Sequence, residues 1–328
     1  MSQTSQRSHS DLAGSVGARV TIRLKQASGG YRDIVGILQS MQSGAGEIIN
    51  SKGEKVIFSE NEIAIWREIK PLPDRAGTGA PYSIRIHELE ALSDATWPAD
   101  KIIEIGNWRL RISDGYTMRA NSVLPQGAAP FGDPGKDLDR AVEEITNIYL
   151  DHRLKPTFTI PLPIYQDLNI YLEDRGWKLK VGAEYLVNDI PANLDFSSSE
   201  FDILVTDEPT SEWLAVQSDF PLEKIMRKYP AKYAEIKFQG ENIAVGRIAT
   251  QGSWSLATRV FVDPEFRGKG VGRLLMNALM SAAQNQRATK IGLQVDVENG
   301  AALALYRAMG FRFHHPYVYR VLDKSERK

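Results

Sequence analysis

Glycine and basic residues are interleaved in the stretch Arg267-Gly268-Lys269-Gly270-Val271-Gly272-Arg273, the part of the sequence best suited to bind an anion. Apolar residues recur with helical spacing after it, as far as about residue 286, so it stands at the N-terminus of an expected amphipathic helix. Backbone N–H groups at a helix N-terminus point toward an anion, and glycines let a phosphate approach the backbone closely. With the charges of Arg267, Lys269 and Arg273, these features predict a pyrophosphate site.

The order of residues in this stretch argues against two other phosphate-binding motifs. A dinucleotide-binding turn requires Gly-x-Gly-x-x-Gly, whereas the order here is Arg-x-x-Gly-x-Gly. No Gly-Lys-Ser/Thr follows, as a P-loop would require. Taken alone, the stretch is also compatible with a tight strand-to-helix turn that binds nothing.

A second motif follows the expected helix and a strand at about 291–297. Asn299 can cap a helix over 300–309, and Gly310 can end it. The residues of the motif, Asn-x-x-Ala-x-x-Leu-Tyr-x-x-x-Gly-Phe, are Asn299, Ala302, Leu305, Tyr306, Gly310 and Phe311. Together with Arg267, Gly270 and Gly272, this pair of motifs resembles the GNAT superfamily of acyl-CoA-dependent N-acyltransferases over residues 254–319.

The resemblance implies a cofactor site with a defined set of residues. Backbone groups on a splayed strand would bind the pantetheine arm and the acetyl carbonyl, and the amides of 268–273 would bind the pyrophosphate. Asn299 would bond to the cofactor near the pantetheine, and Tyr306 would lie near the thioester sulfur. The cofactor-binding residues expected for acetyl-CoA are Val260, Phe261, Val262, Arg267, Gly268, Lys269, Gly270, Val271, Gly272, Arg273, Asn299 and Tyr306.

The reaction implied is the attack of an amine on a thioester, which relies on positioning, carbonyl polarisation and proton transfer. Tyr306 is the candidate catalytic acid, because a phenol can protonate a thiolate leaving group; the alternative is a core aromatic. Candidates for a base are Glu298, Asp296 and Glu241, each of which also reads as a solvated surface carboxylate.

Several aromatic and histidine residues are weaker candidates for the acceptor site. His314 and His315 follow the expected Gly310-Phe311 turn and are interpreted as exposed hairpin residues, with a place in the acceptor pocket as the alternative. Trp254, Tyr317 and Tyr319 fit either an acceptor site or an ordinary sheet.

The composition limits the chemistry that is open to the chain. Its 328 residues carry 40 Lys and Arg against 41 Asp and Glu, a net charge of -1, so nucleic acid is not expected as a partner. With no cysteine and no metal-binding spacing among its five histidines, neither a thiol nucleophile nor a protein-bound metal is expected. No apolar run approaches the roughly 18 residues of a membrane span. Residues 1–15 lack the apolar core of a signal peptide, so a cytoplasmic location is expected.

Composition and pattern divide the chain into five parts. These are a flexible tail (1–15), a small β-barrel (16–70), a Pro/Gly-rich linker (71–81) and two larger segments (82–190 and 191–328). Five short runs of alternating apolar residues fill the first folded part, which resembles the SH3-like barrel of some actinobacterial acetyltransferases. A barrel that packs on its neighbour or aids dimerisation is the first interpretation.

The segment 82–190 reads as a degenerate copy of the catalytic segment. Gly176-Trp177 aligns with Gly310-Phe311, and a helix over 138–152 takes the place of the motif helix. Strands are expected at 108–112, 117–123, 157–160 and 181–187. The loop 131–137 carries two aspartates, and Pro134 removes a backbone donor, so this copy is not expected to bind acyl-CoA. Arg119, Asn121 and Ser122 are interpreted as structural, with the inter-domain cleft as the alternative.

The sequence thus predicts an α/β (α+β) fold of tandem GNAT-like mixed sheets flanked by helices, preceded by a small SH3-like β-barrel. The expected function is acetyl-CoA-dependent transfer of an acetyl group to a primary amine of a small molecule or protein. The alternative is an acetyl-CoA-sensing module whose barrel engages a protein or RNA. No membrane partner is expected, and a homodimer is left open.

Overall fold

The computed structural model describes residues 12–50, 54–68 and 82–323, so the linker expected at 71–81 lies outside the described residues. The chain forms two compact units, 1–78 and 79–328. Each is described by itself.

The first unit is a five-stranded antiparallel sheet in the order β4-β3-β2-β1-β5. Its strands are β1 (Arg19–Lys25), β2 (Tyr31–Gln42), β3 (Ala45–Asn50), β4 (Lys55–Ser59) and β5 (Ile63–Glu68). The alternation in the sequence arises because one face of these strands buries Val20, Ile22, Leu38 and Ile48. No pairing joins β4 to β5 within 12–50 and 54–68, so the sheet is open there and the SH3-like barrel stays a prediction.

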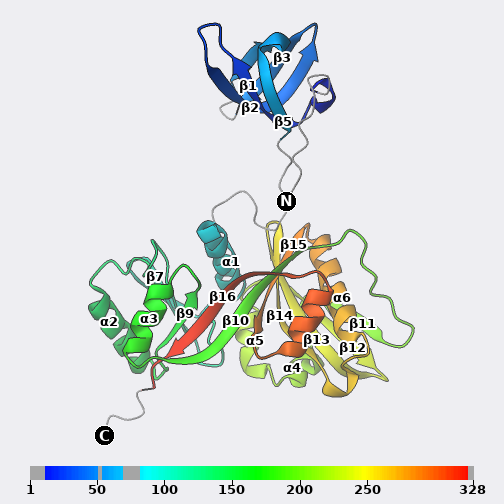
Figure 1. Cartoon of the computed structure of the whole chain (residues 1–328). Helices are drawn as coiled ribbons and strands as arrows, with labels where there is room; N and C mark the ends of the chain where they lie inside the picture. Colours follow the sequence, from blue (N-terminus) through cyan, green and yellow to red (C-terminus); the bar gives the residue numbers. More distant parts are fainter. Residues whose placement is uncertain (1–11, 51–53, 69–81, 324–328) are drawn as a thin grey trace. The chain divides into compact units, whose positions relative to one another are not determined.

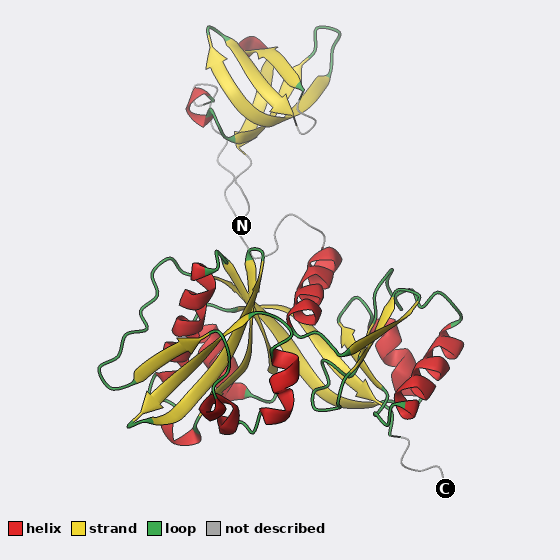
Figure 2. Cartoon of the chain, turned by 180° about the vertical axis from the view of Figure 1, so that it is seen from behind, coloured by secondary structure: helices red, strands yellow, loops and turns green. Residues whose placement is uncertain are grey.

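The second unit is built on one 11-stranded mixed sheet in the order β11-β12-β13-β14-β15-β10-β16-β9-β8-β7-β6 (Figure 1). Its strands are β6 (Lys101–Ile105), β7 (Trp108–Ile112), β8 (Val123–Leu124), β9 (Thr157–Pro161), β10 (Lys178–Asp189), β11 (Asp202–Thr206), β12 (Ala231–Phe238), β13 (Glu241–Gln251), β14 (Trp254–Val262), β15 (Lys290–Asp296) and β16 (Arg312–Val321). The mixed sheet with helices packed on it is the fold class that the sequence predicts (Figure 2).

Helices pack against both halves of this sheet. They are α1 (Tyr82–Thr96), α2 (Leu138–Asp151), α3 (Gln166–Asp174), α4 (Ser211–Val216), α5 (Glu223–Met226), α6 (Val271–Asn285) and α7 (Gly300–Ala308), with short 3₁₀ turns η4 (Phe220–Leu222) and η5 (Pro264–Phe266). The apolar stripe of α6 buries Leu275, Ala278 and Leu279 in the core. The helices expected at 138–152 and after Gly270 are therefore present. The strand expected at 117–123 is wrong, because turns and hydrogen-bonded loop fill that range as far as Ser122.

The two halves of the unit exchange their last strands. β10 closes the segment 82–190 in the chain but lies between β15 and β16, while β16 lies between β10 and β9. Figure 1 shows β10 (green) and β16 (red) running side by side across the middle of the unit. Tyr185, Leu186 and Val187 of β10 are all buried, which is typical of a central strand covered on both faces. The boundary at 190/191 therefore divides the chain but not the sheet.

Candidate active site

Two neighbouring strands separate at the centre of the sheet. β14 and β15 pair in parallel from Trp254 and Lys290 to Ala257 and Leu293, and the pairing stops there although both strands continue. Beyond that point, β14 pairs only with β13. The unpaired backbone of β14 is therefore available to a ligand lying between the strands.

A cavity of about 500 Å³ opens at this splay. It brings together the end of β14, the loop before α6, the first turn of α6 and the first two turns of α7. The residues that line it are Val260, Phe261, Val262, Arg267, Gly268, Gly270, Gly272, Arg273, Asn299, Ala301, Ala302, Leu305 and Tyr306. All of the predicted cofactor-binding residues except Lys269 and Val271 are among them.

The side chains of Lys269 and Val271 do not line the cavity. The ammonium group of Lys269 lies 4.9 Å from the centre of the Phe266 ring, and the Val271 side chain is buried in the core beneath α6. The role predicted for both rested on their backbone amides, which belong to the same loop and first turn as the lining residues.

The loop before α6 forms a cradle of free backbone donors. Gly268 and Gly270 have φ angles of +75° and +84°, the left-handed region that favours glycine. Gly270 caps α6 without a side chain, so the first N–H groups of the helix have no intrahelical partner. A Cβ on Gly272 would lie 2.8 Å from Cδ2 of Leu305, so the Leu305 side chain, which lines the cavity, would have to move to accommodate it. The cradle fits an anion in shape and polarity.

The basic residues of the cradle are anchored to the protein. The Nε of Arg267 donates to the Val262 carbonyl oxygen at 3.1 Å, and a terminal nitrogen of Arg273 donates to the Ala308 carbonyl oxygen at 3.3 Å. Neither guanidinium has an ion-pair partner among the described residues, so both charges remain available to a ligand.

Asn299 and Tyr306 line the cavity from α7. The Asn299 side-chain oxygen accepts a hydrogen bond from the Ala302 N–H at 3.1 Å, which caps α7; the amide NH₂ has no acceptor among the described residues and is a donor open to a ligand. Tyr306 is 6% exposed, with its ring centre 5.6 Å from that of Phe311. Its hydroxyl has no hydrogen-bond partner among the described residues. Burial raises the pKa of Tyr306 to about 12, so the phenol keeps its proton at neutral pH.

The three carboxylates predicted as bases do not line the cavity. Asp296 is exposed at the end of β15, where it accepts a hydrogen bond from the Glu298 N–H at 2.8 Å. Glu298 and Glu241 are exposed as well. Trp254, Tyr317 and Tyr319 are also absent from the lining, and the two tyrosines pack together with their ring centres 5.6 Å apart.

The expectation of exposed histidines is wrong. His314 and His315 lie on β16 and are 7% and 0% exposed. The His315 Nε2 lies 3.0 Å from a carboxylate oxygen of the buried Glu90 on α1, and the two Nδ1 atoms lie 2.9 Å apart. If His315 is neutral and donates to Glu90 from Nε2, its Nδ1 carries no hydrogen and accepts from His314 Nδ1–H. His314 Nε2 is then a bare nitrogen, buried without a partner among the described residues. Burial, and after it His315 and Arg85, lower the pKa of His314 to about 4.

In the segment 82–190, protein carboxylates occupy the donors that a phosphate would use. Asp137 caps α2 by accepting from the Arg140 N–H at 3.2 Å, at the helix position that Gly270 has in α6. Asp133 accepts from the Gly135 N–H at 2.9 Å and from the Asn107 side chain at 3.0 Å. That the first copy binds no acyl-CoA stays a prediction.

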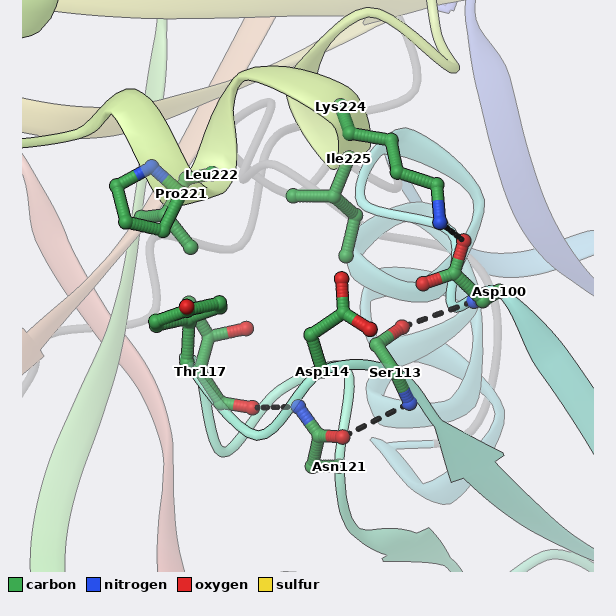
Figure 3. Close-up of a pocket in the computed structure, with 10 residues that line it drawn as sticks. Asp100, Ser113, Asp114, Thr117, Asn121, Pro221, Leu222, Lys224 and Ile225 are labelled. Carbon is green, nitrogen blue, oxygen red and sulfur yellow. Dashed lines mark hydrogen bonds and ion pairs between the residues drawn. The ribbon is translucent and has the colours of Figure 1, made fainter.

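A crevice separates the loop 113–121 from η4 and α5 (Figure 3). The space inside it, about 10 Å³, suits a single water molecule. Figure 3 shows the Asn121 side chain turned to its own loop, where its oxygen accepts from the Ser113 N–H at 2.8 Å and its NH₂ donates to the Thr117 carbonyl oxygen at 2.7 Å. Asn121 is therefore structural, as expected, and so is Ser122, which bonds to Arg111 and Thr159. Arg119 instead bonds across to Gln294 on β15.

The described residues show neither a metal cluster nor a membrane-spanning helix. Among them there is no group of three or more His, Asp or Glu side chains placed to hold a metal ion. The helices in the described ranges are also too short or too polar to cross a membrane.

The splayed strands, the glycine cradle and the Asn299/Tyr306 helix define an N-acetyltransferase of the GNAT class, and comparisons with known proteins agree. The chain belongs to the family described as "Probable histone acetyltransferase Rv0428c C-terminal", whose pattern matches residues 83–320.

Two curated relatives match over long stretches. The uncharacterized N-acetyltransferase YobR of Bacillus subtilis is 28% identical over 250 residues, which cover 72% of this chain and 98% of that protein. The probable histone acetyltransferase Rv0428c of Mycobacterium tuberculosis is 26% identical over 319 residues, which cover 93% and 94%. The second match includes the first unit of the present chain.

Solved structures share the fold. A GCN5-related N-acetyltransferase from Kribbella flavida superimposes with a TM-score of 0.55 at 14% identity, covering 73% of this chain and 95% of that one. A tandem GNAT protein from the clavulanic acid biosynthesis pathway gives a TM-score of 0.50 at 14% identity, covering 73% and 87%. The chain is thus an acyltransferase of the GNAT fold.

Proposed function

We propose that the protein uses acetyl-CoA to acetylate a primary amine, by direct attack of the amine on the thioester. The observation that carries this proposal is the cavity at the splay, which combines the glycine cradle, unpaired β14 backbone, Asn299 and Tyr306. Acetyl-CoA is an activated acyl donor, so the chain itself needs neither a nucleophile nor a metal for the transfer.

The residues present fit this co-substrate. The cradle at residues 268–273 offers helix N–H groups and the charges of Arg267 and Arg273 to a pyrophosphate. The unpaired strand from Val260 to Val262 offers backbone groups to an amide-containing arm. The free NH₂ of Asn299 adds a donor at the N-terminus of α7.

Tyr306 is the residue that we assign as the acid. Its raised pKa keeps the phenol protonated, the residue lines the cavity, and its hydroxyl has no hydrogen-bond partner among the described residues, so it can donate a proton to a thiolate. None of the three candidate carboxylates lines the cavity, so the proposal assigns no general base.

Two classes of acceptor amine fit the proposal, an amine of a small molecule and an amine of a protein. One relative is named a probable histone acetyltransferase, and another, 35% identical over 82 residues, is the mycothiol acetyltransferase of Kocuria rhizophila. The first name favours lysine-containing peptides as acceptors, and the second favours small amines.

The test is free-thiol release from acetyl-CoA against a panel of basic peptides and small amines. We expect turnover with at least one class, and a loss of about a hundredfold in kcat for Tyr306→Phe with little change in CoA affinity. Tyr171→Phe, on the corresponding helix of the first copy, is the matched control and should leave kcat unchanged. Tight CoA binding without turnover of any amine, and with no effect of Tyr306→Phe, would refute the assignment as an acetyltransferase.

A further inference from the structure

A β-bulge lies directly before the cavity-lining part of β14. Val245 pairs with Phe261 and Arg247 with Thr258, so the single residue Gly246 on β13 faces two residues on β14. The first of the two, Arg259, has a φ of +54°, in the left-handed region that non-glycine residues rarely adopt. This conformation persists only where surrounding contacts hold it.

The contacts come from one short stretch between α4 and η4. The Gln217 NH₂ donates to the backbone carbonyl oxygen of Arg259 at 3.0 Å. The Asp219 carboxylate accepts two hydrogen bonds from the Arg259 guanidinium, one of them from Nε at 2.8 Å. Gln217 thus holds the main chain of Arg259, and Asp219 holds its side chain.

Asp219 is itself rigidly placed. It is 2% exposed, and its N–H donates to the Leu214 carbonyl oxygen at 2.7 Å. A buried carboxylate that meets a guanidinium with two hydrogen bonds has a fixed direction, unlike a solvated surface pair. The Arg259 side chain, 29% exposed, reaches inward to meet it.

The bulge sets the direction of the backbone that follows. Val260, Phe261 and Val262 line the cavity, and β14 has already left β15 at Ala257. On that side no partner strand holds these peptide groups, so their orientation depends on the backbone at Arg259 together with the pairing of Phe261 and Val262 to β13. The 217–219 stretch, which holds Arg259, therefore contributes to any backbone contact with the reacting part of a ligand.

We propose that Asp219 and Gln217 are positioning residues for acetyl transfer, because they hold the Arg259 bulge that aims the backbone of 260–262 at the thioester. The inference rests on the proposed function. The inference assigns different roles to two parts of the site: the glycine cradle binds the cofactor, and the β14 backbone at 260–262 positions the thioester. Among the hydrogen bonds and ion pairs of the described residues, none joins the cradle to the 217–219 stretch. We call the contacts of Gln217 and Asp219 to Arg259 the clamp. Loss of the clamp should lower the rate of acetyl transfer more than it lowers the affinity for CoA.

The test compares full-length variants Asp219→Asn and Gln217→Ala with a matched control, Asp100→Asn. Asp100 is also an ion-paired aspartate beside α5, with Lys224 and Lys228, but it has no bond to β14 in the described chain. Gln217→Ala is the milder change and keeps the test open if Asp219→Asn unfolds. Calorimetry gives the affinities for CoA and acetyl-CoA, thiol release gives kcat and KM, and circular dichroism gives Tm.

We expect CoA affinity within about twofold of wild type in all three variants, with kcat lower by about tenfold in Asp219→Asn and about threefold in Gln217→Ala. Asp100→Asn should keep its kcat. An unchanged kcat in both clamp variants, a CoA affinity that falls together with kcat, or an equal loss in Asp100→Asn would overturn the proposal.

Measurements on the wild-type protein test the proposed function independently of the clamp. If it binds CoA but acetylates no amine, the proposed function fails. The clamp is then judged by the preference for acetyl-CoA over CoA, which Asp219→Asn should reduce about threefold because only acetyl-CoA carries the thioester carbonyl. An unchanged preference overturns the clamp, and a wild-type chain that binds neither ligand overturns both proposals.

Discussion

Acidification should destabilise the second unit through His314, by an amount that follows from its surroundings. The folded state holds the pKa of this imidazole at about 4 against an ordinary 6.5, because burial disfavours the charged ring, whose Nε2 has no hydrogen-bond partner among the described residues. His315 on β16 and Arg85 on α1 add repulsion, while Glu90 is engaged by His315.

The direction in which pH changes the free energy of unfolding follows from proton linkage. The folded pKa of His314 is depressed, so the unfolded chain binds the proton more tightly, and stability is fully present above pH 6.5 and lost as the pH falls toward 4. At about pH 4.5 the two pKa values correspond to a loss of about 2.5 kcal/mol, which partial access of solvent to the ring reduces to about 1–2 kcal/mol.

The variant His314→Asn isolates this contribution. An asparagine NH₂ can replace the Nδ1–H donor to His315 but does not titrate. Urea unfolding at about pH 7.5, 5.5 and 4.5 gives the free energy of unfolding of both proteins. We expect the wild type to lose about 1–2 kcal/mol more than the variant between the extremes. Parallel loss in the two proteins, or a greater loss in the variant, would refute the placement of the bare Nε2 against buried surroundings.

Three further predictions concern binding and cooperativity. Gly272→Ala should weaken CoA binding by about threefold, because its Cβ displaces the Leu305 side chain that lines the cavity, whereas Gly300→Ala, with nothing within 4 Å of the added Cβ, should not; calorimetry measures both. Arg111→Leu should destabilise the unit by about 2 kcal/mol, since the hydrogen bonds of the buried guanidinium to Ser122 and Thr159 are lost while Asp94 keeps its ion pair with Arg109; an unchanged free energy of unfolding in urea would contradict this. Residues 79–328 should unfold in one transition, and separate transitions by fluorescence and circular dichroism would contradict the continuous sheet.

The local features of the site could be predicted because their signals lie close together in the sequence. The stripe of α6, the glycines before it and the cap at Asn299 each depend on residues within a few turns, and the structure places them at one cavity. The neighbours of a strand in the sheet could not be predicted in this way. Nothing in the pattern of β10 states that it lies beside β15 and β16, because apolar residues fit any central position equally well.

The errors have the same origin. Histidines after a turn are polar by type, and only a carboxylate 225 residues away, Glu90, makes the burial of His315 acceptable. The clamp at Arg259 was also missed, because a bulge depends on the pairing register with β13 and leaves no fixed residue pattern. An arginine where the backbone is left-handed gives no sign in the sequence itself.

The exchanged strands also constrain how the chain can be made and shortened. β10 is complete when residue 189 leaves the ribosome, but neither β15 nor β16, its neighbours in the sheet, has yet been synthesised. Until the C-terminal residues emerge, the described strands of the first copy therefore have three unpaired edges, one on β9 and both on β10. A chain cut at the boundary between the copies would leave both products with open edges. Each half of the unit thus supplies a strand that the sheet of the other half requires.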